Sequence, residues 1–323
     1  MNVLVTGATG FLGSELVYQL LEVGYHIRIF RRETSKLDLL SPVVNDIEHV
    51  TGDDITDLEA LRRAMKNVQV VFHVAGNVKF GSRSLNHVNV RGTAAVVDAA
   101  RETGIERLVH TSSVAAIGTS QGGISDENTE WRDKPWPYAQ SKHMAELEVQ
   151  RSIAEGLDAV IVNPSLILGP DRSGGKALNL THDYALKIRA GRAWLYPTGG
   201  TNVVDVTDVA AGHLAALERG QTGVRYILGS ENLSWKSIIS TLAEALGVKP
   251  PRIPLPYNLA LVGGGFIDLL SFMTGRRSPL GRSTVTYALK TREYSNTHAI
   301  SELGCSFRPF SETAQRVSDS LKR

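Results

Sequence analysis

The sequence predicts an α/β fold, in which a doubly wound, parallel sheet is covered by helices and a smaller lobe follows toward the C-terminus. Strand-like and helix-like segments alternate through the first half of the chain, which is typical of strand–helix–strand units. The strand-like segments are uninterrupted runs of Val, Ile and Leu, and such runs indicate strands covered on both faces. The 323 residues suffice for one α/β domain with an extension, or for two small domains.

The first expected strand is Val3-Leu4-Val5, which runs directly into a glycine-rich turn and a helix. The later strands are expected at 25–30, 47–50, 68–74, 107–111, 158–162 and 225–228, and the later helices at 57–65, 87–101, 137–154, 209–217, 234–246 and 257–273. Asp208 or Thr207 is expected to cap the helix at 209–217. Ligands of such sheets bind at the carboxyl ends of the strands, so the residues that follow each strand are the candidates for function.

The turn after the first strand has the glycine spacing of a dinucleotide-binding site. Gly7 permits a tight turn, Gly10 leaves room for a pyrophosphate at the backbone, and Gly13 lets the helix lie close to the strand. The helix N-terminus then offers free N–H groups and a partial positive charge to that anion. The alternative is an ordinary turn, but the position between a buried strand and a helix favours the dinucleotide.

Arg31 and Arg32 stand at the end of the second expected strand, where an NAD-selective site presents a carboxylate to the adenosine ribose. Two guanidinium groups there can pair with a 2′-phosphate through charge-assisted hydrogen bonds. We therefore expect NADP(H) rather than NAD(H) as the cofactor. The alternative is a solvated basic loop.

Tyr138 and Lys142 are four residues apart on an expected helix, so their side chains share one face. A free tyrosine titrates near pH ~10, and a nearby ammonium group favours the phenolate. A tyrosine with a lowered pKa can serve as a general acid or base. The alternative is an ordinary surface pair.

Composition and charge exclude several classes of site. The formal net charge is +2 with acids and bases interspersed, so nothing indicates a nucleic-acid surface. Cys305 is the single cysteine, which excludes an internal disulfide, and no histidine pair has the spacing of a zinc site, so no metal is expected. We see no secretory leader and expect a cytoplasmic protein. The segment 257–273 is too interrupted to span a membrane; we expect it to cover the substrate cleft, with membrane attachment or a subunit contact as alternatives.

The chain resembles the extended short-chain dehydrogenase/reductases, a family with a Rossmann fold. Eight segments carry this likeness: TGATGFLG at 6–13, DITD at 54–57, VFHVAG at 71–76, NVRGT at 89–93, TSSVAAIG at 111–118, YAQSK at 138–142, NPSLILGP at 163–170 and VDVTDVAAGH at 204–213. Within the family, the chain is most similar to bacterial dihydroflavonol-reductase-like proteins and to hopanoid-associated sugar epimerases. This resemblance implies a small-molecule substrate and a family-like homodimer.

The resemblance also implies roles for individual residues. Ser113 matches the residue that steadies the substrate oxygen; the alternatives are Ser112, or a Ser113 hydroxyl that only caps a turn. Lys142 is expected to bond the nicotinamide ribose. Asn89 matches an asparagine behind the site, although a plain helix cap is the alternative. The expected cofactor-binding residues are Gly7, Thr9, Gly10, Phe11, Leu12, Gly13, Arg31, Arg32, Asp54, Ile55, Val74, Ala75, Gly76, Tyr138, Lys142, Asn163, Pro164 and Ser165.

Two functions follow from the family, and the sequence favours one of them. Sugar-nucleotide members often carry an arginine for the diphosphate where this chain has Asn202, and the pair Arg31-Arg32 favours the reducing NADPH pool. We therefore expect reduction of a ketone or aldehyde carbonyl, with Tyr138 as general acid. The alternative is an NAD(P)-dependent sugar-nucleotide epimerase or dehydratase. The dinucleotide domain is expected at 1–165 with a sheet-completing segment at about 203–230, and the substrate-binding lobe at 166–202 and 231–323.

Overall fold

The computed structural model describes residues 1–78, 82–120, 123–132, 136–172, 180–192, 195–274, 285–286 and 289–322. Its main feature is a seven-stranded sheet in the order β10-β6-β5-β4-β1-β2-β3, with every neighbouring pair parallel. The strands are β1 (Asn2–Thr6), β2 (His26–Arg31), β3 (Glu48–Thr51), β4 (Val70–His73), β5 (Arg107–Thr111), β6 (Ala159–Pro164) and β10 (Arg225–Leu228). The predicted doubly wound, parallel sheet is confirmed.

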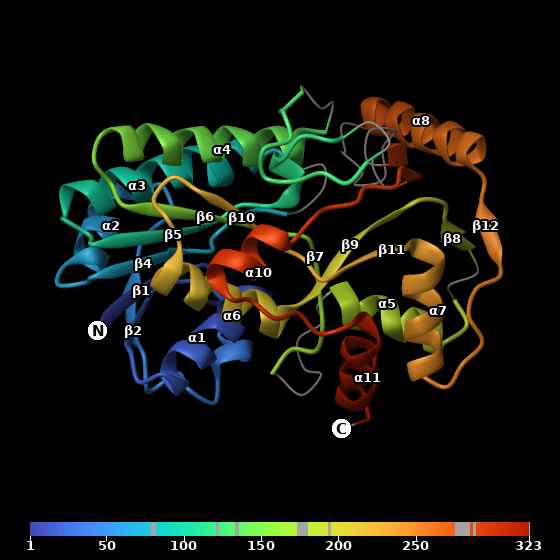
Figure 1. The fold of residues 1–323 in the computed structure, drawn as a ribbon, viewed down its shortest axis with the longest axis horizontal. Coiled ribbons are helices and arrows are strands. Elements are labelled where there is room, and N and C mark those ends of the chain that lie inside the picture. Colours follow the sequence, from blue (N-terminus) through green and yellow to red (C-terminus); the bar gives the residue numbers. More distant parts are fainter. Residues whose placement is uncertain are drawn as a thin grey trace.

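Helices cover both faces of this sheet (Figure 1). One face carries α1 (Phe11–Glu22) and α6 (Val206–Arg219), and the other carries α2 (Leu58–Met65), α3 (Gly92–Glu102) and α4 (Pro137–Ala154). The side chains of β1 show why both faces are buried. Val3 and Val5 pack with α1 and α6, whereas Leu4 between them packs with the helices of the opposite face. Successive side chains of a strand point to opposite faces, so a fully covered strand must be apolar throughout.

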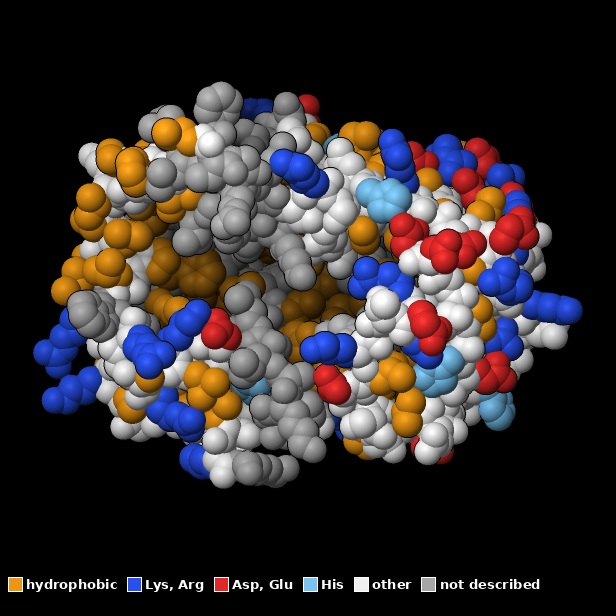
Figure 2. All heavy atoms as spheres, turned by 180° about the vertical axis from the view of Figure 1, so that it is seen from behind, with side chains coloured by type: hydrophobic (Ala, Val, Ile, Leu, Met, Phe, Trp, Pro, Cys, Tyr) orange, Lys and Arg blue, Asp and Glu red, His pale blue; other side chains and the backbone are white. Residues whose placement is uncertain are grey.

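A second group of elements follows in the C-terminal half. It includes a three-stranded sheet in the order β11-β9-β7 and a two-stranded ribbon of β12 and β8. Its elements are β7 (Leu166–Leu168), α5 (Leu180–Arg189), β8 (Leu195–Pro197), β9 (Gly200–Asp205), β11 (Glu231–Ser234), α7 (Trp235–Ala245), β12 (Ile253–Leu255), α8 (Tyr257–Thr274) and α11 (Phe310–Ser320). Helix α10 (Thr297–Leu303) instead packs with α6 and β10 beside the large sheet. Helices α5, α7 and α11 share one apolar cluster with β9. Seen from behind, the molecule is hollowed between its two ends (Figure 2).

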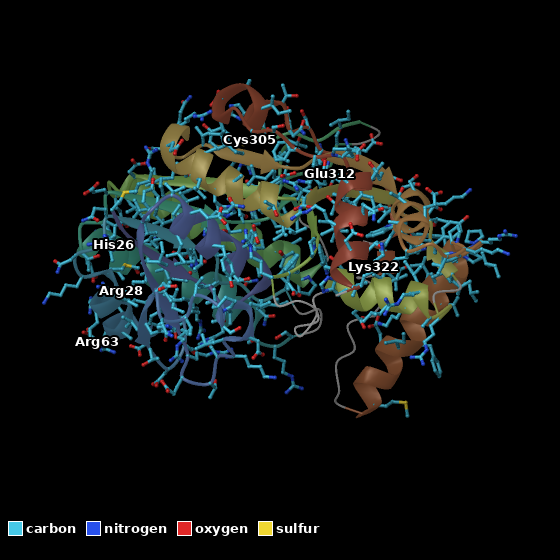
Figure 3. The ribbon with its side chains drawn as sticks, turned by 90° about the horizontal axis from the view of Figure 1, so that it is seen from below. His26, Arg28, Arg63, Cys305, Glu312 and Lys322 are labelled. Carbon is cyan, nitrogen blue, oxygen red and sulfur yellow. The ribbon has the colours of Figure 1, made fainter. Side chains whose placement is uncertain are left out.

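Figure 3 shows the same division from below. His26, Arg28 and Arg63 lie at the end formed by the large sheet, whereas Glu312 and Lys322, on and after α11, lie toward the C-terminal elements. No described helix combines the length and the apolarity that crossing a bilayer requires. The boundaries of the two proposed domains stay a prediction.

Two expected elements differ in detail. The helix expected at 209–217 begins earlier, at Val206, and neither Asp208 nor Thr207 caps it; the cap is Asp205, which accepts from the Thr207 N–H at 2.8 Å. Asp208 instead accepts two hydrogen bonds from the Arg308 guanidinium, at 2.9 and 2.7 Å. The cap was mispredicted because the helix begins three residues earlier than expected, which places Asp208 in its first turn, where it pairs with Arg308. The helix expected at 87–101 starts as a π-helical turn, Asn86–Arg91, before α3.

Candidate active site

The connection between β1 and α1 has no room for a side chain at Gly7 or at Gly13. Gly7 has a φ of +73°, and a Cβ placed there would stand 2.6 Å from the backbone nitrogen of Ala75. A Cβ on Gly13 would overlap the carbonyl oxygen of Gly7. Glycine is therefore required at both positions, one for its conformation and one for close packing.

The N-terminus of α1 is open at this turn. Gly10 is exposed and is the N-cap residue, so no side chain accepts from the first backbone N–H groups, those of Phe11, Leu12 and Gly13. Thr9, beside it, is half-buried. Free N–H groups at a helix start form a site for an anion, and the missing side chains let it approach the backbone. The turn thus fits a pyrophosphate.

Lys142 lies beneath the loop that follows β4. Its side chain is buried, and Nζ donates a hydrogen bond of 2.8 Å to the carbonyl oxygen of Thr111, at the end of β5. Nζ also lies 3.3 Å from the point where a Cβ on Gly76 would stand. Burial lowers the pKa of Lys142 to about 8, while the nearby Glu146 carboxylate acts to raise it. The lysine thus joins the ends of β4 and β5 and remains mostly protonated at neutral pH.

Tyr138 is on the first turn of α4, one turn before Lys142. It is half-buried, and its ring contacts that of Trp136, with the centroids 5.0 Å apart. Pro137 before it occupies the first helical position, where a missing N–H costs nothing. The helix therefore starts just ahead of Tyr138 and carries Tyr138 and Lys142 on one face.

Asn89 is buried in the π-helical turn and joins three segments. Its Oδ1 accepts from the Asn77 N–H at 2.7 Å, and its Nδ2 donates to the Asn77 carbonyl at 3.1 Å and to Ser141 Oγ at 2.9 Å. Since Ser141 lies next to Lys142, Asn89 holds the loop after β4 against α4. Its amide caps no helix; the N-cap of α3 is Arg91.

Ser113 and Asn163 meet at the carboxyl ends of β5 and β6. Asn163 is buried, and its Nδ2 donates to the Ser113 carbonyl at 3.0 Å. Ser113 is half-buried, and its Oγ accepts from the Ala115 N–H at 3.2 Å. The alternative, Ser112, is buried, and its hydroxyl acts to lower the pKa of Glu146. These surroundings favour Ser113 as the serine that faces a substrate.

The segments beside this junction complete the predicted set. Val74 and Ala75 are half-buried after β4, and the Val74 N–H donates to the Thr6 carbonyl at 3.2 Å. Pro164 ends β6, and the buried Ser165 follows, with its N–H donating to the Leu228 carbonyl at 3.0 Å. Contacts thus connect the glycine turn, the β4 loop and the ends of β5 and β6.

Sequence reasoning missed Glu146, which lies one turn beyond Lys142. Its side chain is buried, accepts from Asn163 Nδ2 at 2.6 Å, and lies 3.5 Å from the Arg225 guanidinium. Burial raises the pKa of Glu146, while Ser112, Arg225, Asn163 and Lys142 act to lower it. The spacing 138, 142, 146 was a signal in the sequence, because a carboxylate at that interval shares the face of the Tyr–Lys pair.

Sequence reasoning also missed a chain of hydrogen bonds through His73, which is fully buried. Its Nδ1 lies 2.8 Å from Thr6 Oγ1 and its Nε2 lies 3.0 Å from Thr93 Oγ1. Thr93 Oγ1 donates to the Asn89 carbonyl at 2.6 Å, so its remaining role is to accept from His73, which assigns the proton to Nε2. Burial lowers the pKa of His73 to about 3, so the ring stays neutral. The chain connects β1 to Asn89.

The histidines show no metal site. Burial lowers the pKa of His213 to about 4 and that of His110 well below its usual range, and His143 stacks on Trp131. Among the described residues, no cluster of three or more His, Cys, Asp or Glu side chains is arranged to hold a metal ion.

Arg31 and Arg32 lie apart from the Tyr138–Lys142 face and have different surroundings. Arg31 Nε donates to His49 Nδ1 at 3.1 Å, and its Nη1 donates to the Arg32 carbonyl at 3.1 Å. Arg31 therefore braces the loop after β2, and Arg32 is exposed.

Asp54 and Ile55 follow β3. The Asp54 carboxylate accepts from the Thr56 N–H at 2.7 Å and pairs with His87 at 2.7 Å; the hydrogen bond to His87 is the main cause that lowers the pKa of Asp54 to about 2. Ile55 is buried against Gly92 at the start of α3. This pair is thus fixed in place beside α3.

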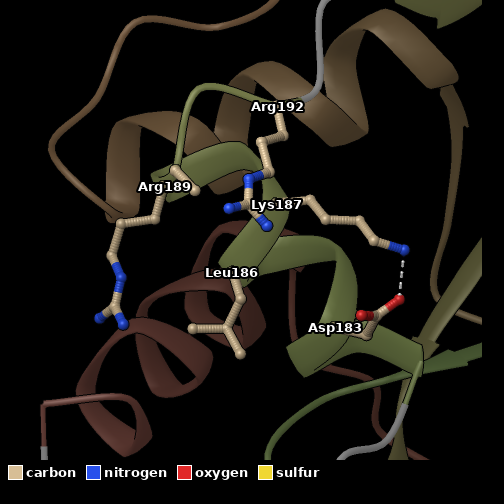
Figure 4. Close-up of a pocket in the computed structure, with 6 residues that line it drawn as sticks. Asp183, Leu186, Lys187, Arg189 and Arg192 are labelled. Carbon is tan, nitrogen blue, oxygen red and sulfur yellow. Dashed lines mark hydrogen bonds and ion pairs between the residues drawn. The ribbon is translucent and has the colours of Figure 1, made fainter.

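A surface hollow of about 380 Å³ lies along α5, away from these elements (Figure 4). It is lined by Asp183, Leu186, Lys187, Arg189, Ala190 and Arg192, and Lys187 pairs with Asp183 at 2.6 Å. None of these residues belongs to the predicted site.

Comparison with protein families identifies the fold. The model of the NAD-dependent epimerase/dehydratase family matches residues 3–229. The chain belongs to this family.

Similar proteins include several reductases. A Synechocystis protein that carries the name dihydroflavonol 4-reductase is 36% identical over 98% of this chain and 92% of its own length. Cinnamoyl-CoA reductase 2 of Arabidopsis thaliana is 33% identical over 79% of each chain. The crystal structure of gox2253 is 34% identical, with a TM-score of 0.85 over 99% of this chain and 97% of the other. Family membership and these relatives support an enzyme of the oxidoreductase type that works with a nicotinamide dinucleotide.

Proposed function

We propose that the protein is an NADP(H)-dependent oxidoreductase that reduces a ketone or aldehyde carbonyl, with Tyr138 as the general acid. The observation that carries this proposal is the buried ammonium group of Lys142, one helical turn from Tyr138 and packed beneath the loop after β4. Relatives named as reductases support the direction of the reaction.

Each residue of the proposed site has a separate role in the reaction. Tyr138 donates its proton to the carbonyl oxygen, and the positive charge of Lys142 stabilises the phenolate that remains. Ser113 donates a hydrogen bond to the same oxygen and fixes its position. Asn89 positions Ser141, the residue before Lys142, and the Glu146 carboxylate stabilises the charge of Lys142 from one turn further along α4. When bound, the reduced nicotinamide supplies the hydride.

The cofactor is assigned to the glycine turn and to the ends of the strands. When the cofactor is bound, the open N-terminus of α1 would hold the pyrophosphate, and the loop after β4 and the segment after β6 would hold the nicotinamide. Arg32 takes the 2′-phosphate, and Arg31 holds the loop that presents it. We assign this binding to residues 1–165 with about 203–230, and substrate binding to 166–202 and 231–323.

A sugar-nucleotide epimerase or dehydratase is the second candidate, because the family is named for those activities. In that case the hydride would return to the product and no cofactor would be consumed. Asn202 does not support this candidate, since it is buried and donates to Asn232 rather than offering a positive charge.

A panel of ketones and aldehydes, offered with NADPH and with NADH, tests the proposal. Steady loss of the reduced-nicotinamide absorbance with NADPH is the expected result, and Tyr138→Phe should abolish it. Interconversion of UDP-hexoses without net cofactor consumption would replace the reductase with the epimerase.

A further inference from the structure

Helix α8 exposes large apolar side chains along one side. The exposed fractions of Leu259, Val262, Phe266 and Met273 are 62%, 71%, 60% and 73%. Their spacing places them on one face, while Ala260 and Gly264, on the opposite face, are buried. A helix on the surface of a soluble protein ordinarily buries its large apolar side chains and exposes polar ones. Among the described side chains of α8, the two buried residues are small, and the four most exposed apolar ones are large.

The exposed apolar surface continues onto the ribbon of β8 and β12. Leu195 and Ile253 are partners in its register, and 46% and 58% of their surfaces are exposed. In Figure 1, α8, β12 and β8 lie at the end of the molecule away from the large sheet, and Figure 2 shows hydrophobic side chains gathered at that end. We call the six residues Leu195, Ile253, Leu259, Val262, Phe266 and Met273 the apolar edge.

Exposed cations lie on the segments that lead into β8 and β12. Lys249 and Arg252 are exposed just before β12, and the exposed Arg189 and Arg192 precede β8 (Figure 4). In Figure 2, Lys and Arg side chains border the hydrophobic ones.

We propose that the apolar edge binds the surface of a lipid bilayer that contains anionic headgroups. An interfacial helix inserts large apolar side chains among the acyl chains while nearby cations bind the headgroups, and this protein has both parts at one end. A second copy of the chain is disfavoured as the occupant, because a two-fold contact would bring the exposed cations Lys249 and Arg252 of both copies together. The helix lies on the surface, since it cannot cross a bilayer.

Flotation of the full-length protein with vesicles tests this inference without any measurement of enzyme activity. The protein should float with vesicles of phosphatidylcholine and phosphatidylglycerol, float less with pure phosphatidylcholine, and be released by salt. The double variant Val262→Asp/Phe266→Asp should lose binding. Lys249→Ala/Arg252→Ala should lower the affinity for anionic vesicles about tenfold.

Ile300→Asp is the matched control, because Ile300 is an exposed apolar residue on α10, outside the apolar edge. This control should bind vesicles like the wild type, and circular dichroism should show that all variants are folded. Absence of wild-type binding to anionic vesicles overturns the inference, as does equal binding by Val262→Asp/Phe266→Asp. A change from dimer to monomer in that variant, without vesicle binding by the wild type, would assign the apolar edge to a second copy.

Discussion

The two ends of the molecule depart from the usual rule of burial in opposite ways. At the large sheet, charged and polar groups are buried, among them Lys142, Glu146 and His73. At α8, large apolar groups such as Val262 and Phe266 are exposed. Lys142, Glu146 and His73 each have a hydrogen-bond partner inside the chain, whereas most of the surface of Val262 and Phe266 is exposed. The chain itself stabilises the buried polar groups at the large sheet. The exposed apolar groups of α8, in contrast, need a surface outside the chain to cover them.

The hydrogen bonds of the buried polar groups at the large sheet also fix the positions of the site residues. Buried polar groups connect segments from distant parts of the sheet, as when Asn163 donates to both Ser113 and Glu146. A satisfied buried network positions its members accurately, but removing one member leaves the others unpaired. Substitutions there should therefore cost stability as well as activity. At α8, stability should hardly respond.

The largest effect is expected at Tyr138. Tyr138→Phe removes the proton donor and should lower kcat by about 10²–10⁴-fold, with little change in melting temperature. Steady-state kinetics with NADPH and an active carbonyl compound measures this effect. Retention of most of the turnover would show that another group donates the proton.

Glu146 should affect both stability and the pH profile. Glu146→Ala leaves Lys142 and Arg225 without their buried carboxylate and should lower the free energy of unfolding by roughly 3 kcal/mol, measured by urea denaturation. Glu146→Gln keeps the amide of Asn163 paired and serves as the milder variant.

Glu146→Gln also tests the direction in which the pH profile of kcat/KM shifts. Lys142 is a cation below its pKa of about 8, so the wild-type kcat/KM should decline as the pH rises through about 8. Glu146 acts to raise that pKa, and Glu146→Gln should therefore move the decline to lower pH. A decline at unchanged pH would reduce Glu146 to a structural role.

Gly13 tests the packing of the glycine turn. Gly13→Ala places a methyl group against the Gly7 carbonyl and should destabilise the fold by about 1–3 kcal/mol, and dinucleotide affinity should fall with it. Thermal unfolding with and without NADP separates the two losses. Gly24→Ala is the control for a glycine whose Cβ would meet no neighbour, although its positive φ carries a strain of its own.

Substitution of Arg32 and substitution of Arg31 should affect the cofactor preference differently. Arg32→Ala removes the exposed guanidinium and should lower the ratio of NADPH to NADH efficiency by about tenfold or more. Arg31→Ala loosens the loop through His49 and should raise KM for both cofactors. An unchanged preference in Arg32→Ala would refute the assignment of the 2′-phosphate.

The smallest effect on stability is expected at the apolar edge. Phe266→Ser should change the free energy of unfolding by less than about 0.5 kcal/mol, because its ring is exposed. Phe72→Ala, at a fully buried ring in the sheet, should cost about 3–5 kcal/mol. Denaturation curves of the two variants compare the ends of the molecule directly; a large loss in Phe266→Ser would mean that the ring packs inside the fold.

The sequence by itself determined the parallel sheet, the glycine turn and the shared face of Tyr138 and Lys142, because each depends on residues only a few positions apart. Only the tertiary structure decided the cap of α6, the path from Thr6 through His73 to Asn89, and the outward direction of the large side chains on α8. Arg308 reaches Asp208 across a hundred residues, and His73 meets Thr93 because β4 lies against α3. Such pairings follow from the order of strands and helices in space, and no local pattern records them.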